Sequence, residues 1–126
     1  MVYVVNNGSN SFTPIIIVTN TAGTAISVGS GPNGIAITPN GQTVYVSNSG
    51  DSDVTPIATS SNTAGVTIPV ASDPQAIAIT PSGQTAYVDS YFVGVTPITT
   101  ASQQQRWPLG HGHPEPRGDY FGGGRT

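Results

Sequence analysis

Four aspartates are the residues of this chain whose type and placement could carry chemistry. Asp51, Asp53, Asp73 and Asp89 stand among Ser, Asn and Gly in turn-like segments, and no Lys or Arg precedes Arg106. Carboxylate and amide oxygens are ligands that calcium prefers, and crowded carboxylates attract cationic partners. In an up-and-down order of strands, the loops that carry these residues emerge on the same face of the sheets, so the four carboxylates are expected to share one acidic binding rim. Calcium is the one cofactor that would suit it. Because Asp, Asn and Ser also form ordinary turns, a purely structural role is the alternative.

A catalytic constellation is not visible in the sequence. The chain has no Cys, which excludes disulfides, zinc thiolate sites and cysteine nucleophiles. Both histidines, His111 and His113, lie near Glu115 in a segment rich in Pro and Gly, where metal binding competes with a plain unstructured tail. Elsewhere, general acid–base catalysis would depend on Asp or Tyr alone. We therefore expect no catalytic residues and no enzyme activity.

Composition favours an all-β protein and argues against several partners. The 126 residues include 16 Thr, 13 Val and 11 Ile, and β-branched side chains favour sheets over helices. The formal net charge is −3 with only three basic residues, so we expect no nucleic-acid binding, which needs several neutralised phosphates. No apolar run reaches the roughly 18 residues of a membrane span. The N-terminus lacks a basic region before an apolar stretch, so no signal peptide is expected.

The chain repeats itself with a period of 42 residues. Aligning residues 2–43 with residues 44–85 gives 24 identities without a gap, and a third, shorter copy begins at Ala86. Each complete unit predicts four short antiparallel strands, which in the second unit cover residues 35–38, 43–47, 53–58 and 66–70. A polar turn is expected at residues 60–65. Four strands in such a unit are typical of one blade of a β-propeller, and a solenoid of β-arcs is the structural alternative.

Three sets of repeated positions support this architecture. They are the turn glycines Gly41 and Gly83, the inner-strand isoleucines Ile35, Ile37, Ile77 and Ile79, and the tyrosines Tyr3, Tyr45 and Tyr87. The glycines are expected to take the left-handed position of a hairpin turn. The Ile-Ala-Ile segments have no polar member, which predicts an inner strand covered on both faces. The tyrosines are expected to pack between blades, and a repeated ligand platform is the alternative.

These motifs resemble the YVTN-type β-propeller repeat of prokaryotic surface-layer-like and secreted proteins. The resemblance covers residues 2–100 and is carried by Tyr3-Val4-Val5-Asn6, Tyr45-Val46-Ser47-Asn48, two Ile-Ala-Ile-Thr-Pro segments and the Thr-Pro-Ile strands. The third copy departs from the pattern at Asp89. The resemblance implies an extracellular or cell-surface, non-enzymatic module with a protein or carbohydrate partner. An inactive fragment of a larger propeller is the alternative, and the family's similarity to lactonase-like propellers implies a hydrolase remnant as a third.

The strand order predicts an incomplete propeller of about 2.5 blades in residues 1–102, in units near 2–43, 44–85 and 86–100. The chain begins at the second strand of a blade, so neither end face has a neighbour. Each uncovered face of a few hundred Å² forfeits several kcal/mol at about 25 cal/mol per Å², against a net stability of roughly 5–15 kcal/mol. We therefore expect a marginal monomer that pairs with further blades or with itself.

Composition changes abruptly at Gln103. Residues 103–126 hold all three Arg, both His and the single Trp, and they are rich in Gly and Pro. Such a segment cannot build a core. We expect either a disordered tail or the product of a shifted reading frame.

Overall fold

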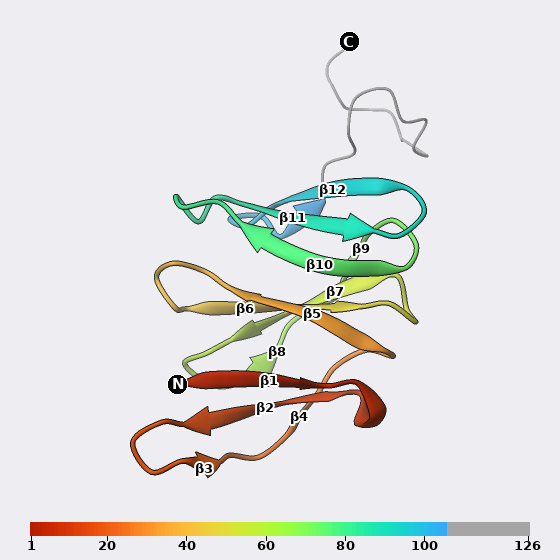
Figure 1. Cartoon of the computed structure of the whole chain (residues 1–126). Coiled ribbons are helices and arrows are strands. Elements are labelled where there is room, and N and C mark those ends of the chain that lie inside the picture. The colour runs from red at the N-terminus through yellow and green to blue at the C-terminus, as the bar shows by residue number, and fades with distance from the viewer. Residues whose placement is uncertain (106–126) are drawn as a thin grey trace.

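The structure is a computed structural model that describes residues 1–105, so the predictions for Arg106 onward, including His111, His113 and Glu115, lie outside the described residues. Three antiparallel sheets stack one above another (Figure 1). The first contains β1 (Val2–Asn6), β2 (Ser11–Ile16), β3 (Thr21–Ala22) and β4 (Ile26–Ser27), with a short 3₁₀ turn, η1 (Asn7–Ser9), after β1. The second contains β5 (Pro32–Ile37), β6 (Thr43–Asn48), β7 (Asp53–Ala58), β8 (Thr63–Ala64) and β9 (Ile68–Pro69). The third contains β10 (Pro74–Ile79), β11 (Thr85–Ser90), β12 (Gly94–Thr99) and β13 (Gln104–Gln105).

The order of strands within each sheet follows the predicted repeat. The second sheet runs β5-β6-β7-β8, the third runs β10-β11-β12-β13, and the first runs β1-β2-β3. The first sheet therefore starts with the equivalent of β6 and has no described equivalent of β5. The all-β fold with antiparallel repeating sheets is confirmed.

The outermost strand of each unit differs from the prediction. Residues 66–70 were expected to form one strand, but two short strands, β8 and β9, lie on the same edge of β7. Thr63 and Ala64, predicted as turn, form β8. Pro56 explains the break: its carbonyl accepts the Gly65 N–H at 2.7 Å, so it faces the outer strand, yet proline has no N–H to donate in return. Pro14 interrupts the first sheet in the same way.

Left-handed backbone recurs at equivalent positions of the repeat. Gly41 has φ 74° and Gly83 has φ 78°, the left-handed conformation that a tight hairpin turn requires. The turn between the third and fourth strands of each unit repeats the pattern at Asn20, Asn62 and Gln103, with φ of 53°, 53° and 55°. Gln103, which the sequence analysis placed in the tail, thus completes the last turn, and Gln104–Gln105 follow as β13 paired with β12. The repeated geometry therefore continues past the point where sequence identity ends, with Gln103 in the place that Asn62 holds in the second unit.

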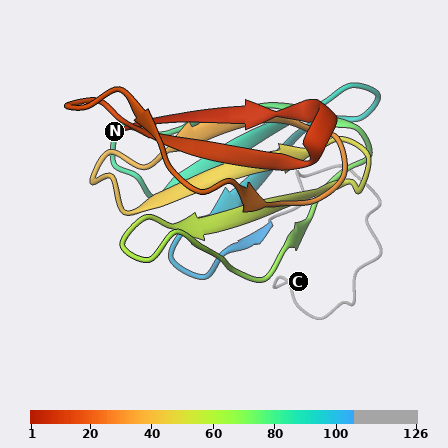
Figure 2. The same ribbon diagram turned by 90° about the horizontal axis from the view of Figure 1, so that it is seen from below.

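Neighbouring sheets pack face to face, and their innermost strands approach most closely. A Cβ atom on Gly34 of β5 would lie 2.1 Å from the Gln75 carbonyl oxygen of β10, so only glycine fits there. Ser47 of β6 ties the same sheets together, because its hydroxyl donates to the Gln75 carbonyl oxygen at 2.6 Å. The same hydroxyl accepts the Gly34 N–H at 2.8 Å. In Figure 2, which looks along the stack, the three sheets overlie one another.

The core lies between the sheets in two separate layers. One layer, between the first and second sheets, contains Phe12, Val44, Val46 and Ile57. The other, between the second and third sheets, contains Tyr45, Val54, Ile68, Val70, Ala86, Val88 and Ile98. Alternate residues of β6 enter opposite layers, as the two-residue period of a strand requires. The second sheet is therefore sandwiched, whereas the first and third sheets each have one face without a described neighbour.

The prediction of full burial for the Ile-Ala-Ile segments is wrong. Ile35, Ile77 and Ile79 are half-buried, and Ile37 is 46% exposed. The most buried strand is β6 instead. The physical reason is position: β5 and β10 are the innermost strands and pair along one edge only, so their other edge has no strand beside it among residues 1–105. They nevertheless pack against neighbouring sheets, as inner strands should.

Candidate functional site

The loops that carry the predicted acidic rim lie on one edge of the stack. Backbone hydrogen bonds join each loop between the second and third strands of a unit to the connection between sheets. Val70 N–H donates to the Ser52 carbonyl at 3.0 Å, and Tyr91 N–H donates to the Asp73 carbonyl at 3.0 Å. These hydrogen bonds bring the Ser52 loop beside Val70, and the Tyr91 loop beside Asp73.

Three of the four aspartates on this rim hold loops together through their side chains. Asp51 accepts the Ser30 N–H at 2.8 Å, Asp53 accepts from Asn48 Nδ2 at 2.8 Å, and Asp73 accepts from Gln75 Nε2 at 2.7 Å. Asp89 is exposed on β11. Within residues 1–105, no three acidic or histidine side chains come together in a group that could hold a metal ion. These contacts support the structural interpretation of the turn residues more than the calcium interpretation.

Asp51 is nevertheless close enough for its negative charge to act on Asp53. Burial raises the pKa of the Asp53 carboxyl above its usual range. The hydrogen bond from Asn48 lowers the pKa in part, and the negative charge of Asp51 raises it again. A carboxyl with these neighbours takes up a proton more readily in the folded chain than in the unfolded chain.

Asn48 connects the rim to the core. It is fully buried, and its Nδ2 donates to both Asp53 and Thr55 Oγ1, each at 2.8 Å, while its Oδ1 has no partner. Asn6 repeats the arrangement in the first sheet, where its Nδ2 donates to Thr13 Oγ1 at 2.8 Å. This repetition assigns the asparagine a role in joining the second and third strands of a unit.

The three repeated tyrosines differ in exposure, and the difference follows from whether another sheet packs on them. Tyr45 is 1% exposed between the second and third sheets, and burial raises the pKa of its hydroxyl. Tyr3 is half-buried and its ring lies 5.6 Å from that of Phe12. Tyr87 is 45% exposed. Packing between sheets thus accounts for Tyr45 and Tyr3, whereas Tyr87 lies on a face that lacks a following sheet in the described residues.

Apolar side chains are exposed on both end faces of the stack, and on the third sheet the exposed Asp89 shares the face of Tyr87, because alternate residues of β11 point to the same side. On the third sheet, Tyr87 and Val95 are 45% and 48% exposed, and on the first sheet Val2 and Val4 are 48% and 42% exposed. Their equivalents in the second sheet, Tyr45, Val54, Val44 and Val46, are buried. We call these surfaces the third-sheet face (Tyr87, Val95) and the first-sheet face (Val2, Val4).

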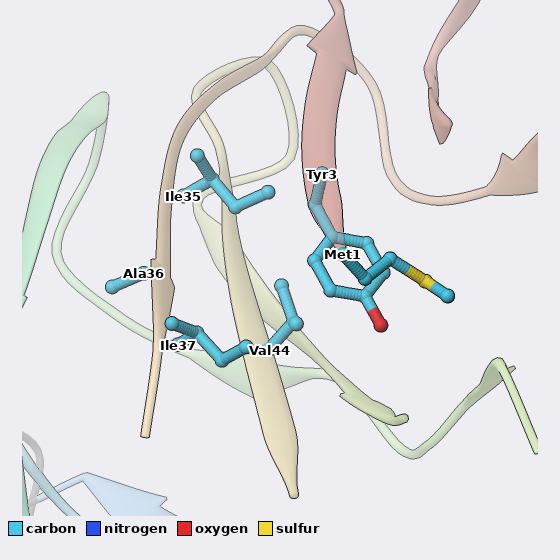
Figure 3. Close-up of a pocket in the computed structure, with 6 residues that line it drawn as sticks. All are labelled: Met1, Tyr3, Ile35, Ala36, Ile37 and Val44. Carbon is cyan, nitrogen blue, oxygen red and sulfur yellow. The ribbon is translucent and has the colours of Figure 1, made fainter. Parts of the chain in front are cut away.

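An open pocket of about 190 Å³ lies beside β1, and sequence reasoning missed it. Its lining is Met1, Tyr3, Ile35, Ala36, Ile37 and Val44, none of which has a charged side chain (Figure 3). The signal that could have revealed it was in the predicted strand order, because a unit that begins at its second strand leaves a space where its first strand would lie. The exposed, edge-to-face pair Tyr91 and Phe92, with ring centroids 4.7 Å apart, was also missed.

No helix of the described residues is long and apolar enough to cross a membrane. No protein-family model matches the sequence, and no curated protein is similar to it.

Two solved structures are similar to the chain in fold. Kuenenia stuttgartiensis hydrazine synthase matches with a TM-score of 0.78 and 26% identity over 80% of this chain and 30% of that chain. Dihydro-heme d1 dehydrogenase NirN, in complex with DHE, matches with a TM-score of 0.73 and 16% identity over 83% of this chain and 23% of that chain. Both are β-propeller proteins, so the sheets of this chain are propeller-like blades. The chain spans less than a third of the length of either protein.

Proposed function

We propose that this chain is a non-enzymatic β-propeller module of the YVTN type that acts at the cell surface or outside the cell. Its role is to bind protein through its end faces, and the first partner it fits is a second copy of itself. The sequence motifs around Tyr3 and Tyr45 support the family and, through it, the location. The acidic rim remains a second place for a cationic protein or a carbohydrate.

The observation that carries the proposal is the contrast between Tyr45 and Tyr87. The two residues occupy the same repeat position, but Tyr45 is 1% exposed under the third sheet and Tyr87 is 45% exposed. Inside the chain, the Tyr45 side of one sheet packs on the Val88 side of the next sheet. The first-sheet face presents Val4 at the position of Val88. The third-sheet face of one copy therefore offers the surface on which the first-sheet face of another copy would continue the stack.

Such an association is head-to-tail, which gives it a distinctive test. Sedimentation equilibrium of the full chain should show an oligomer that dissociates on dilution. Tyr87→Glu and Val4→Glu should each yield monomers, because an unpaired charge in an apolar interface is unfavourable. Mixing the two variants should restore a dimer, since one intact pair of faces remains. Tyr91→Glu, at an exposed aromatic residue of the rim loop, is the matched control and should associate normally.

Two alternatives make different predictions. An inactive fragment of a larger propeller would aggregate irreversibly or be digested rapidly by protease, without a defined oligomer. A hydrolase, which the lactonase-like resemblance suggests, would turn over a lactone. The two similar solved structures are named as a synthase and a dehydrogenase, but the chain corresponds to only part of each. A native chain that stays monomeric at all concentrations would contradict the proposal.

A further inference from the structure

The inner edge of β1 is an unpaired strand edge in the part of the chain that the structure describes. β6 pairs with β5 on one side and β7 on the other, and β11 likewise pairs with β10 and β12. β1 is their equivalent, yet among residues 1–105 it pairs only with β2. An unpaired edge presents free N–H and C=O groups to an added strand.

The alternating direction of backbone hydrogen bonds along a strand identifies which N–H and C=O groups of β1 face its unpaired edge. The Thr43 carbonyl of β6 accepts the Thr38 N–H at 2.9 Å, so Thr43 faces the inner strand. Because backbone groups alternate in direction along a strand, Ser47 faces the inner strand as well. By the repeat, Tyr3 and Val5 direct their N–H and C=O groups to the open edge.

Two blades show which strand fits on such an edge. In the second sheet Ile35, Ala36 and Ile37 of β5 oppose Val46, Tyr45 and Val44, and in the third sheet Ile77, Ala78 and Ile79 of β10 oppose Val88, Tyr87 and Ala86. Transferred to β1, this register sets Ile, Ala and Ile opposite Val4, Tyr3 and Val2. Aliphatic residues in directly opposed positions stabilise paired strands.

The pocket beside β1 supplies the surface for the other side of that strand. In Figure 3, Ile35 and Ile37 project from β5 toward Tyr3 and Val44, whereas Ala36 projects the opposite way. Ile37 is 46% exposed, while the equivalent Ile79, which packs where β5 approaches β10, is half-buried. The alanine of an added strand would therefore cover Ile35 and Ile37, as β5 covers β10.

We propose that the open edge of β1, with the pocket beside it, binds one extended polypeptide segment of the pattern Gly-Ile-Ala-Ile in an antiparallel register. The glycine is required by the close approach that Gly34 shows against the next sheet. The residue between the two isoleucines is alanine in both β5 and β10, as Ala36 and Ala78, and it must be uncharged because no residue that lines the pocket has a charged side chain. The inference deepens the proposed function, since both have a polypeptide partner, but it uses a different surface from the third-sheet face.

The test uses the full chain and a synthetic peptide with the sequence of residues 31–40, which contains this pattern. Calorimetric titration should show saturable binding with one peptide per chain. Hydrogen exchange followed by NMR should show new protection of the Tyr3 and Val5 amides, with little change at Val4, which already faces β2. A peptide carrying Ala36→Asp should lose binding, because its carboxylate would be buried against isoleucine side chains without a partner.

Protein variants locate the site and separate the two proposals. Ile37→Glu should weaken peptide binding by about tenfold or more, equivalent to roughly 1.4 kcal/mol. Val18→Glu, at a residue that is 94% exposed and outside the pocket, should bind as the native chain does. Tyr87→Glu should also bind the peptide normally, even though it abolishes self-association. If Ile37→Glu binds unchanged, if Tyr87→Glu prevents binding, or if protection does not alternate along β1, the proposal is wrong.

Discussion

Tyr45 and Tyr87 allow the packing of the blades to be tested with one substitution made twice. A buried Tyr removes about 150–250 Å² from water, which at about 25 cal/mol per Å² amounts to roughly 4–6 kcal/mol. Large-to-small substitutions of fully buried aromatic residues cost about 3–5 kcal/mol. Since Tyr45 is 1% exposed and contacts residues of two sheets, Tyr45→Ala should lower the free energy of unfolding by about 3–5 kcal/mol. Tyr87 is 45% exposed, so Tyr87→Ala should cost roughly 2–3 kcal/mol, about half of the transfer term of a buried Tyr and without a cavity term.

The assay is urea unfolding followed by circular dichroism, at protein concentrations low enough that self-association does not contribute. Both variants change the same residue type in the same strand position, so intrinsic strand propensity cancels between them. Equal losses at Tyr45 and Tyr87 would refute the reasoning, because they would mean that both positions have the same surroundings. Small losses at both would show that the second and third sheets do not pack as described.

Three further predictions follow from individual contacts, each checked by the free energy of unfolding. Gly34→Ala should destabilise the chain by about 1–3 kcal/mol, because the new Cβ overlaps the Gln75 carbonyl. Gly8→Ala, with open space around its Cβ, is the control and should be nearly neutral. An unchanged free energy of unfolding in Gly34→Ala would contradict the close approach of the two sheets. Ser47→Ala should cost about 1–3 kcal/mol, since it removes the hydroxyl that joins the Gly34 N–H to the Gln75 carbonyl, and Ser60→Ala, on the exposed turn between β7 and β8, is its control. Asp53 has a folded pKa above its unfolded value of 3.8, so between these two pKa values the folded chain binds more protons than the unfolded chain, and the free energy of unfolding falls as pH rises through the folded pKa. Asp53→Asn should therefore gain stability relative to the native chain as pH rises from about 3 to 7. A difference in stability that stays constant with pH would count against the raised pKa.

The repeat predicted most of the fold because each unit makes the same local choices. Gly41 and Gly83 close the predicted hairpins, and the strand order within each blade follows from the predicted units. The break between β8 and β9 was not predicted, since it depends on which edge of β7 the missing N–H of Pro56 faces. Which edge the nitrogen of Pro56 faces is set by the register in which β7 pairs with β6, and this register cannot be read from the sequence.

Burial was harder to predict than strand position. Ile35 and Ile37 have an apolar pattern that suits a fully covered strand, but their cover depends on a neighbouring strand beside β1 that the described chain does not provide. The requirement for Gly34 was also invisible, because it arises from a contact with Gln75 in the next blade. Of the candidate site, the shared edge of the acidic loops was predicted from the strand order, whereas the side-chain partners of Asp51, Asp53 and Asp73 depend on loop conformation.

The most direct test of the central claim, that each repeat folds as an antiparallel four-stranded blade packed face to face on the next, is a NOESY measurement on the isotope-labelled chain. Opposed residues in non-hydrogen-bonded pairs bring their Hα atoms close together. The account predicts strong Hα–Hα cross-peaks between Tyr45 and Pro56 and between Ile35 and Val46, which the register pairs. It also predicts contacts from the Tyr45 ring to Val88 and Ile77 across the blades. Absence of the antiparallel cross-peaks, with contacts instead between equivalent residues of successive repeats along the whole unit, would indicate parallel coils and contradict the account.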